Sequence, residues 1–276
     1  MLDGQADKLK ELFGLNVLLN SKPMEAPIKQ SGYWCNHEQF LLKIKGVASY
    51  EVCAKKNTIF IGIDPTLHEH RLILTWLNGI VLAYLLQYHG FLILHGSAIV
   101  VNQKAIVFCG NSGIGKSTLA ATLNQKGYPF LTDDLSVIRI NEHSIELIPM
   151  PTGTKLWRDA LAYLGKSTIG LRAVINRPEK FEMPIENTWN EPIEIARLYE
   201  LTISEEINAI KERQMTGMEQ VKTLLRNTYR YELLKPLGKL GEHLQQVKQM
   251  ANCVPCYQLT RPSHFFCIED LIALIE

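Results

Sequence analysis

The sequence predicts an α/β fold whose centre is a strand, a glycine-rich loop and a helix, and three observations support it. Residues 110–117 read GNSGIGKS and fit the pattern G-x-x-x-x-G-K-[ST] without a gap. The apolar run KAIVFC, suited to a buried strand, comes directly before them. The segment STLAATLNQ at 117–125 follows with a helical pattern. This order is the setting that a phosphate-binding loop requires, so nucleotide binding is the first functional expectation.

The chemistry of such a loop explains its residue types. Glycines at three positions permit backbone angles that a Cβ forbids, so successive N–H groups turn inward and surround phosphate oxygens. The N-terminus of the following helix adds a positive dipole end. Lys116 is expected to reach the β- and γ-phosphates, and the Ser117 hydroxyl is expected to bind Mg²⁺. The predicted nucleotide-binding residues are Gly110, Asn111, Ser112, Gly113, Ile114, Gly115, Lys116, Ser117 and Thr118.

Composition narrows the class of protein. The 276 residues are 46% hydrophobic and 21% charged, which is ordinary for a globular protein. A net charge of +1 gives no electrostatic case for nucleic acid or an anionic membrane as a partner. No apolar run reaches the length of about 18 residues that a membrane span needs, and the N-terminus lacks a signal-peptide core. We therefore expect a cytoplasmic enzyme whose six cysteines stay reduced.

The N-terminal quarter reads as a small β-rich lead-in, which we place at residues 1–66. A short amphipathic helix is expected over 6–19, before prolines at 23 and 27. Three short strands are expected over 40–44, 50–54 and 58–63, separated by turn residues. The remaining residues, 67–276, form the predicted nucleotide-binding core.

The core begins with the strongest helical pattern before the loop, over residues 67–88. Strands over 91–94 and 98–101 follow, and Asn102-Gln103 supplies a turn into the strand before the loop. This hairpin is expected to place His95 near the loop. At a strand end, His95 is interpreted either as a structural residue or as a group that acts on the reacting phosphates.

Two adjacent carboxylates are the second important feature. Asp133 and Asp134 end a predicted strand at 130–132, only 17 and 18 residues after Lys116. Beside a polyphosphate, one carboxylate orients Mg²⁺ and the other accepts a proton from an attacking hydroxyl. The alternative is a solvated Asp-Asp turn. An acidic pair this early after the loop is typical of compact kinases.

The rest of the chain carries weaker signals. Lys155 is a candidate phosphate or substrate contact, with a solvated lysine as the alternative. Cys253 and Cys256 lack a second ligand pair, which argues against a zinc or redox site. The other expected elements are a hairpin over 135–140 and 144–148, a loop over 149–157, a helix over 158–163, an irregular segment over 171–192, a strand over 194–202, helices over 204–213 and 217–231, helical character over 233–252, a strand over 254–259 and a helix over 269–275.

At this point the residues support a resemblance to a known family. The sequence LHGSAIVVNQKAIVFCGNSGIGKSTLAATLNQKGYPFLTDDLSVI resembles the core of the HPr serine kinase/phosphorylase superfamily, with its histidine-glycine strand end, phosphate loop and Asp-Asp strand end. The continuation PMPTGTKLWRDAL resembles shorter HPr-kinase-like proteins found with peptide-modification systems. The implied fold is similar to the nucleotide domain of phosphoenolpyruvate carboxykinase, a mixed sheet flanked by helices.

The resemblance implies ATP, Mg²⁺ and transfer of the γ-phosphoryl group to a serine hydroxyl. By position, Lys116 and Ser117 hold phosphates and metal, Asp134 is the base, Asp133 is the metal or orienting partner, and His95 lies near the reacting phosphates. The second signature of the bifunctional regulator, a stretch with an isoleucine-arginine-glycine core, is absent from the sequence. The resemblance therefore does not extend to phosphorylase activity or to HPr as the acceptor.

Related short proteins in lasso-peptide gene clusters phosphorylate the C-terminal serine of a precursor peptide, which implies a peptide or protein with an acceptor serine as partner. Full-length family members form rings, so the resemblance also implies a homo-oligomer. Two alternatives use the same loop: a small-molecule kinase that ignores peptides, and a nucleotide sensor that binds ATP without transferring phosphate. The Asp-Asp pair favours a transferase, because a sensor needs no base.

Overall fold

The computed structural model describes residues 2–20, 31–150, 153–175, 177–263 and 268–275. They pack into two compact units, each with its own core. The first contains Met1–Gly90 and Arg230–His243, and the second contains Phe91–Tyr229 and Leu244–Glu276. The predicted division into 1–66 and 67–276 stays a prediction about which segments fold independently.

The first unit is built on a five-stranded sheet with the order β1-β5-β4-β3-β2. Its strands are β1 (Asn16–Asn20), β2 (Gly32–Cys35), β3 (Gln39–Ile44), β4 (Ala48–Cys53) and β5 (Thr58–Ile63). The β1–β5 pair is parallel and the other pairs are antiparallel. The three strands predicted for this region are confirmed as β3, β4 and β5.

The helix predicted over 6–19 is wrong in its second half. Helix α1 (Leu2–Phe13) ends before Gly14, whose φ of +65° closes it with an N–H bond to the Lys10 carbonyl. Residues 16–20 instead form β1, which adds to the sheet beside β5. The apolar run VLL suits either structure, and pairing with β5 decides it.

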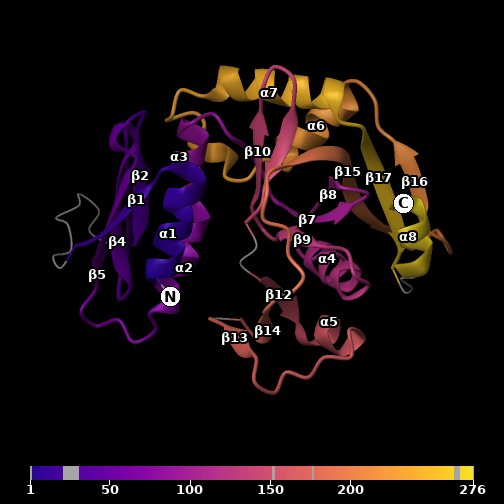
Figure 1. The fold of residues 1–276 in the computed structure, drawn as a ribbon, viewed down its shortest axis with the longest axis horizontal. Coiled ribbons are helices and arrows are strands. Elements are labelled where there is room, and N and C mark those ends of the chain that lie inside the picture. Colours follow the sequence, from indigo (N-terminus) through magenta and orange to yellow (C-terminus); the bar gives the residue numbers. More distant parts are fainter. Residues whose placement is uncertain (1, 21–30, 151–152, 176, 264–267, 276) are drawn as a thin grey trace. The chain divides into compact units, whose positions relative to one another are not determined.

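The predicted helix over 67–88 is present but interrupted. It consists of α2 (Arg71–Trp76), a π-helical turn η2 (Leu77–Val81) and α3 (Leu82–Tyr88), and Gly79 within it has non-helical angles. The segment Arg71–Tyr88 is long and apolar enough to cross a membrane, but more than half of it is buried in the protein. Tyr84 of α3 contacts Phe40 of β3 with ring centroids 5.0 Å apart, so this helix packs against the five-stranded sheet. Figure 1 shows these helices beside the five-stranded sheet.

The second unit contains a nine-stranded mixed sheet, which confirms the predicted α/β class. The order is β6-β10-β11-β15-β8-β7-β9, with β17 added to β15 and β16 to β17. Its strands are β6 (Leu92–Leu94), β7 (Gly96–Val101), β8 (Lys104–Cys109), β9 (Phe130–Thr132), β10 (Ser136–Ile140), β11 (Ile145–Ile148), β15 (Ile193–Ser204), β16 (Lys211–Gln214) and β17 (Cys256–Pro262). Strand β8, which leads into the loop, lies between β15 and β7 in the interior.

Helices cover both faces of this sheet, so its central strands are apolar on both sides. Alternate residues of β8 enter two separate cores: Ala105 and Val107 in one, Ile106 and Phe108 in the other. The first core is completed by α6 (Met218–Arg226) and α7 (Leu240–Cys253), and the second by α4 (Lys116–Gln125) and α8 (Ile268–Ile275). Figure 1 shows these pairs of helices on opposite sides of the strands. The strand before the loop, β8, is therefore buried on both faces, and the helix after it, α4, packs in one of these cores.

Two predicted loops and one predicted helix are wrong. Residues 149–157 and 171–192 were expected to be irregular, but they contribute β12 (Thr154–Trp157), β13 (Arg172–Val174) and β14 (Arg177–Met183), a three-stranded sheet with β14 in the middle. Helix α5 (Arg158–Tyr163) packs on this sheet as predicted. The helix expected over 204–213 is absent, and its end forms β16. The helix expected over 217–231 ends at Arg226.

Candidate active site

The loop between β8 and α4 has the backbone that the motif requires. Gly110 has a φ of +130°, and a Cβ there would lie 2.8 Å from the Leu201 carbonyl oxygen. Gly113 and Gly115 also have positive φ angles, and Gly115 precedes the first turn of α4. Because Gly110 approaches the neighbouring strand so closely, no other residue fits without moving β15.

Lys116 is a buried cation whose hydrogen-bond partners, among the described residues, are backbone carbonyls. Its side chain is 6% exposed, and Nζ donates to the carbonyl oxygens of Gly110 at 2.8 Å and Asn111 at 3.1 Å. Burial lowers the pKa of Lys116 from its ordinary value. Phosphate oxygens are stronger hydrogen-bond acceptors for an ammonium than carbonyl oxygens are. A phosphate bound in the loop would therefore replace these carbonyls as the partner of Lys116.

Asp133 is buried and accepts hydrogen bonds from three hydroxyl groups. Its Oδ1 accepts from Ser97 at 2.6 Å and from Ser117 at 2.8 Å, and its Oδ2 accepts from Thr154 at 2.6 Å. A carboxylate bonded to the loop serine is the oxygen donor set that Mg²⁺ prefers. The residues present therefore fit a magnesium site next to the phosphates.

Asp134 has a different environment from Asp133, its neighbour in the chain. Its backbone is left-handed, with a φ of +65°, a strained angle that Asp tolerates better than most residues. Its side chain is 44% exposed, and Oδ2 lies 3.6 Å from Nζ of Lys155. The turn therefore directs one carboxylate into the protein and leaves the next exposed at the surface.

His95 lies against the backbone of Asp134. Its Nδ1 is 3.1 Å from the Asp134 carbonyl oxygen, and since a carbonyl only accepts, Nδ1 carries the proton and Nε2 is the acceptor nitrogen of the neutral ring. Burial, followed by the charge of Lys116, lowers the pKa of His95 from its ordinary value. The ring also contacts Tyr229, with centroids 6.1 Å apart. His95 therefore sits by Asp134 as a neutral group.

A second network holds the start of the loop. The Asn227 side-chain oxygen accepts from the Gly110 N–H at 2.9 Å, and its carbonyl accepts from the His95 N–H at 2.8 Å. The Asn227 amide donates to Glu200 at 3.2 Å, and Arg226 forms a bidentate pair with the same buried carboxylate. Asn227 thus links the loop to the histidine strand end.

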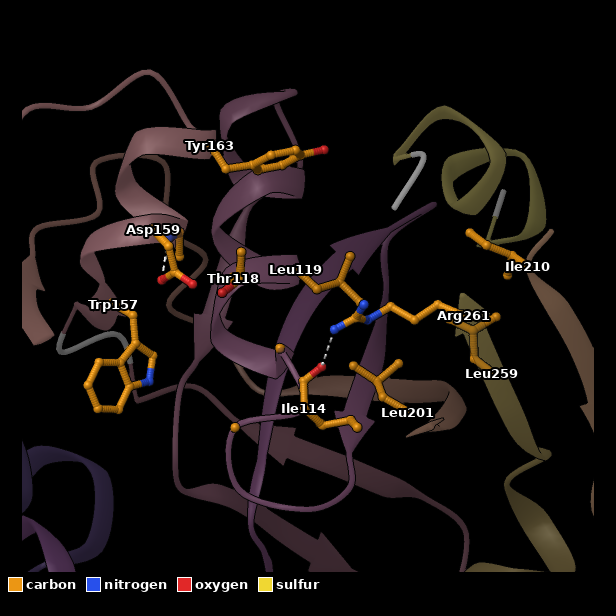
Figure 2. Close-up of a pocket in the computed structure, with 13 residues that line it drawn as sticks. Ile114, Thr118, Leu119, Trp157, Asp159, Tyr163, Leu201, Ile210, Leu259 and Arg261 are labelled. Carbon is orange, nitrogen blue, oxygen red and sulfur yellow. Dashed lines mark hydrogen bonds between the residues drawn. The ribbon is translucent and has the colours of Figure 1, made fainter. Parts of the chain in front are cut away.

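A cavity of about 270 Å³ opens beside the loop. Figure 2 shows Asp159 and Tyr163 of α5 on one side, Arg261 of β17 on the other, and Thr118 between them. Arg261 Nη2 donates to the Ile114 carbonyl at 3.3 Å, which ties β17 to the loop. The lining residues are Gly113, Ile114, Gly115, Thr118, Leu119, Trp157, Asp159, Ala160, Tyr163, Leu201, Ile210, Leu259 and Arg261.

The structure brings the predicted loop residues, His95, Asp133 and Asp134 together in one unit, while their roles stay predictions. Sequence reasoning missed Thr154 and Asn227. Thr154 bonds a carboxylate 21 residues away, and Asn227 bonds the loop across 117 residues, so neither had a local signal. Ser97 had one, because it directly follows His95-Gly96 at the predicted strand end.

Together, the mixed sheet and this loop define a phosphate-loop protein of the α/β class. Comparison with known proteins agrees on one family. HPr kinase/phosphorylase of Chlorobium phaeovibrioides is 30% identical over 108 residues, covering 38% of this chain and 32% of that protein. The same enzyme of Chloroherpeton thalassium is 32% identical over 103 residues, 36% of this chain and 29% of the relative, and that of Mycoplasmopsis pulmonis is 36% identical over 89 residues, 32% and 26%.

These matches support an HPr kinase-like family for the chain, as the resemblance predicted. The matched segments span about a third or less of the length of each relative. No protein-family model matches the chain. The solved HPr(Ser) kinase/phosphatase of Coxiella burnetii aligns with 66% of this chain and 85% of its own, at 12% identity and a TM-score of 0.35. The likeness to the HPr kinase family rests on the sequence matches.

Proposed function

We propose that this protein is an ATP- and Mg²⁺-dependent kinase that transfers the γ-phosphoryl group to a serine hydroxyl of a peptide. The observation that carries the proposal is the difference in environment between Asp133 and Asp134. Asp133 is buried and accepts a hydrogen bond from the loop serine, Ser117. Asp134 is exposed and lies next to His95 and Lys155. A kinase needs this arrangement, because phosphate and acceptor must approach the reaction from different sides.

The nucleotide would be held by the loop and the cavity. The N–H groups of residues 110–117 and the Lys116 ammonium surround the phosphates and stabilise the charge that moves during transfer. The cavity takes the base and ribose, with Tyr163 as an aromatic wall and Asp159 and Arg261 as polar groups. Ser117 and Asp133 would hold Mg²⁺, which supplies charge neutralisation at the phosphates.

Asp134 would align the acceptor hydroxyl and accept its proton. Its exposed carboxylate is open to a second substrate, and the Lys155 ammonium at 3.6 Å fixes the position of one carboxylate oxygen. His95, neutral and hydrogen-bonded to the Asp134 carbonyl, holds the strained turn in place. Most of the rate enhancement is expected from charge stabilisation and positioning rather than from proton removal.

The acceptor class rests on the resemblance of residues 149–161 to short HPr-kinase-like proteins. We propose the C-terminal serine of a ribosomally made precursor peptide of the lasso type, phosphorylated in the cytoplasm. The family likeness also supports a homo-oligomeric assembly as a proposal.

The test is mass spectrometry of a serine-terminated peptide after incubation with the protein, ATP and Mg²⁺, with an Asp134→Asn control. A phosphate-sized mass gain on the terminal serine, absent from the control, is the expected result. Transfer to a metabolite and not to any peptide would favour a small-molecule kinase. ATP binding without transfer to either would contradict a kinase and favour a nucleotide sensor.

A further inference from the structure

The sheet formed by β12, β13 and β14 presents one buried face and one open face. Thr154 and Leu156 point to the buried side, where Thr154 bonds Asp133 and Leu156 packs in the core with α4 and α5. Lys155 and Trp157 alternate with them and are therefore on the other side. In the antiparallel register, Trp157 is opposite Lys180 and Lys155 is opposite Glu182. We call Lys155, Trp157, Lys180 and Glu182 the β12–β14 face.

Two cations lie on this face, one beside Asp134 and the other over the Trp157 ring. Lys155 is 3.6 Å from the Asp134 carboxylate, and Nζ of Lys180 lies 5.9 Å from the centroid of the Trp157 ring. Trp157 is 43% exposed, so its indole has surface free for a ligand. In the part of the chain that the structure describes, no carboxylate pairs with Lys180, while Lys155 has Asp134.

The charge of Lys180 also reaches the phosphate loop. It adds to burial, the largest influence, in lowering the pKa of Lys116. Lys155 and Lys180 are diagonal neighbours in the register of β12 and β14, close enough for two long side chains to contact one ligand, and Lys155 lies beside Asp134.

Building on the proposed kinase function, we propose that Lys155 and Lys180 bind a carboxylate of the acceptor, next to the hydroxyl that Asp134 activates. Trp157 is opposite Lys180 and two residues from Lys155, and it also lines the cavity assigned to the nucleotide, so its indole borders both substrates. The carboxylate comes either from the chain terminus of the acceptor or from an acidic side chain beside the serine. Ammonium groups on flexible stems suit both, since they bind as point charges.

A comparison of matched peptides tests the site. The first ends in serine with a free carboxylate, the second ends in serine amide, and the third is the second with glutamate directly before the serine. We expect the KM of the amide peptide to be about tenfold higher than that of the first, with the KM for ATP unchanged. Recovery in the third peptide assigns the site to an acidic side chain, and lack of recovery assigns it to the chain terminus.

Variants at Lys180 connect this preference to the face. Lys180→Met should raise the KM of the carboxylate peptide about tenfold and remove the difference between the carboxylate and amide peptides. Lys180→Arg should keep the difference, and Lys166→Met, an exposed lysine after α5, should match the wild type. A lost preference with an unchanged KM for ATP cannot arise from misfolding.

Three results would overturn the inference in distinguishable ways. Equal KM values for the carboxylate and amide peptides in the wild type would leave the peptide kinase standing and refute the carboxylate site. A raised KM for ATP in Lys180→Met, with the peptide preference intact, would assign Lys180 to the nucleotide. Absence of transfer to any of the peptides would refute the kinase itself, and the inference with it.

Discussion

Asp133 and Asp134 belong to two regions that differ in almost every physical respect. On the loop side, Asp133 is buried and accepts three hydroxyl bonds, all from within the protein. On the β12–β14 side, Asp134 is 44% exposed and has a single lysine at 3.6 Å. In the proposed kinase, the loop side is preorganised for phosphates and metal, while the other side leaves room for an acceptor. The comparison suggests that nucleotide chemistry and acceptor choice can be changed separately.

The largest effect is expected at Lys116, on the loop side. Lys116→Ala removes the cation aimed at the phosphates, so ATP affinity should fall about a hundredfold and transfer should become undetectable, because charged hydrogen bonds contribute roughly 1.5–3 kcal/mol each. Calorimetric titration with ATP measures this. Lys126→Ala, at the other end of α4, loses only a surface ion pair with Glu269 and should bind normally. Normal binding by Lys116→Ala would disprove the assignment.

Asp134→Asn should separate the two regions. It removes the base but leaves the loop intact, so kcat should fall about a thousandfold while ATP affinity is retained. Asp133→Asn should instead weaken the affinity for nucleotide that is measured in the presence of Mg²⁺. Single-turnover transfer and nucleotide titration of both variants provide the comparison. Full turnover by Asp134→Asn would show that the base assignment is wrong.

A smaller effect is expected at Asn227, which supports the loop without touching the substrate. Asn227→Ala leaves the buried Gly110 N–H without its side-chain acceptor and removes one of the donors to the Glu200 carboxylate, which keeps Arg226. We expect a loss of about 1–3 kcal/mol in the free energy of unfolding, measured by urea denaturation. Asn141→Ala, in an exposed turn, should change it by less than about 0.5 kcal/mol. Equal midpoints for the two variants would refute this support role.

The smallest effect is a pH dependence from His95. Because burial holds the pKa of His95 below its ordinary value of 6.5, the unfolded chain binds the proton more readily than the folded protein. The stability from the neutral ring is therefore present above pH 6.5 and is lost as the pH falls through the lowered pKa. Urea midpoints at several pH values should show a steeper acid loss in the wild type than in His95→Gln. The exposed His143→Gln should follow the wild type.

Much of the loop side could be predicted because its signals are local. The pattern at residues 110–117, the flanking strand and helix, and the carboxylate pair after β9 all lie within about forty residues. The turn at Asn102-Gln103 was also found, and both residues adopt positive φ angles there. Such features depend on backbone preferences and on alternating burial, which neighbouring residues express directly.

Sequence reasoning missed the three-stranded sheet of β12, β13 and β14 for a physical reason. Strand β14 reads RPEKFEM, and its charged residues and proline resemble a loop more than a strand. It becomes a strand because β12 and β13 pair with its two edges and Phe181 enters the core with α5. Likewise, the apolar run in β1 fits a helix or a strand, and β5 selects the strand.

The phosphate loop, the α/β class and the candidate roles of Lys116, Ser117, Asp133 and Asp134 follow from contiguous residues, because a short segment carries its own backbone geometry and periodicity. The different environments of Asp133 and Asp134 do not follow from contiguous residues. They required Thr154 to reach Asp133 from one strand and Lys155 to reach Asp134 from the same strand's other face. Pairing between segments distant in sequence brings those groups together, and a local pattern contains no record of it.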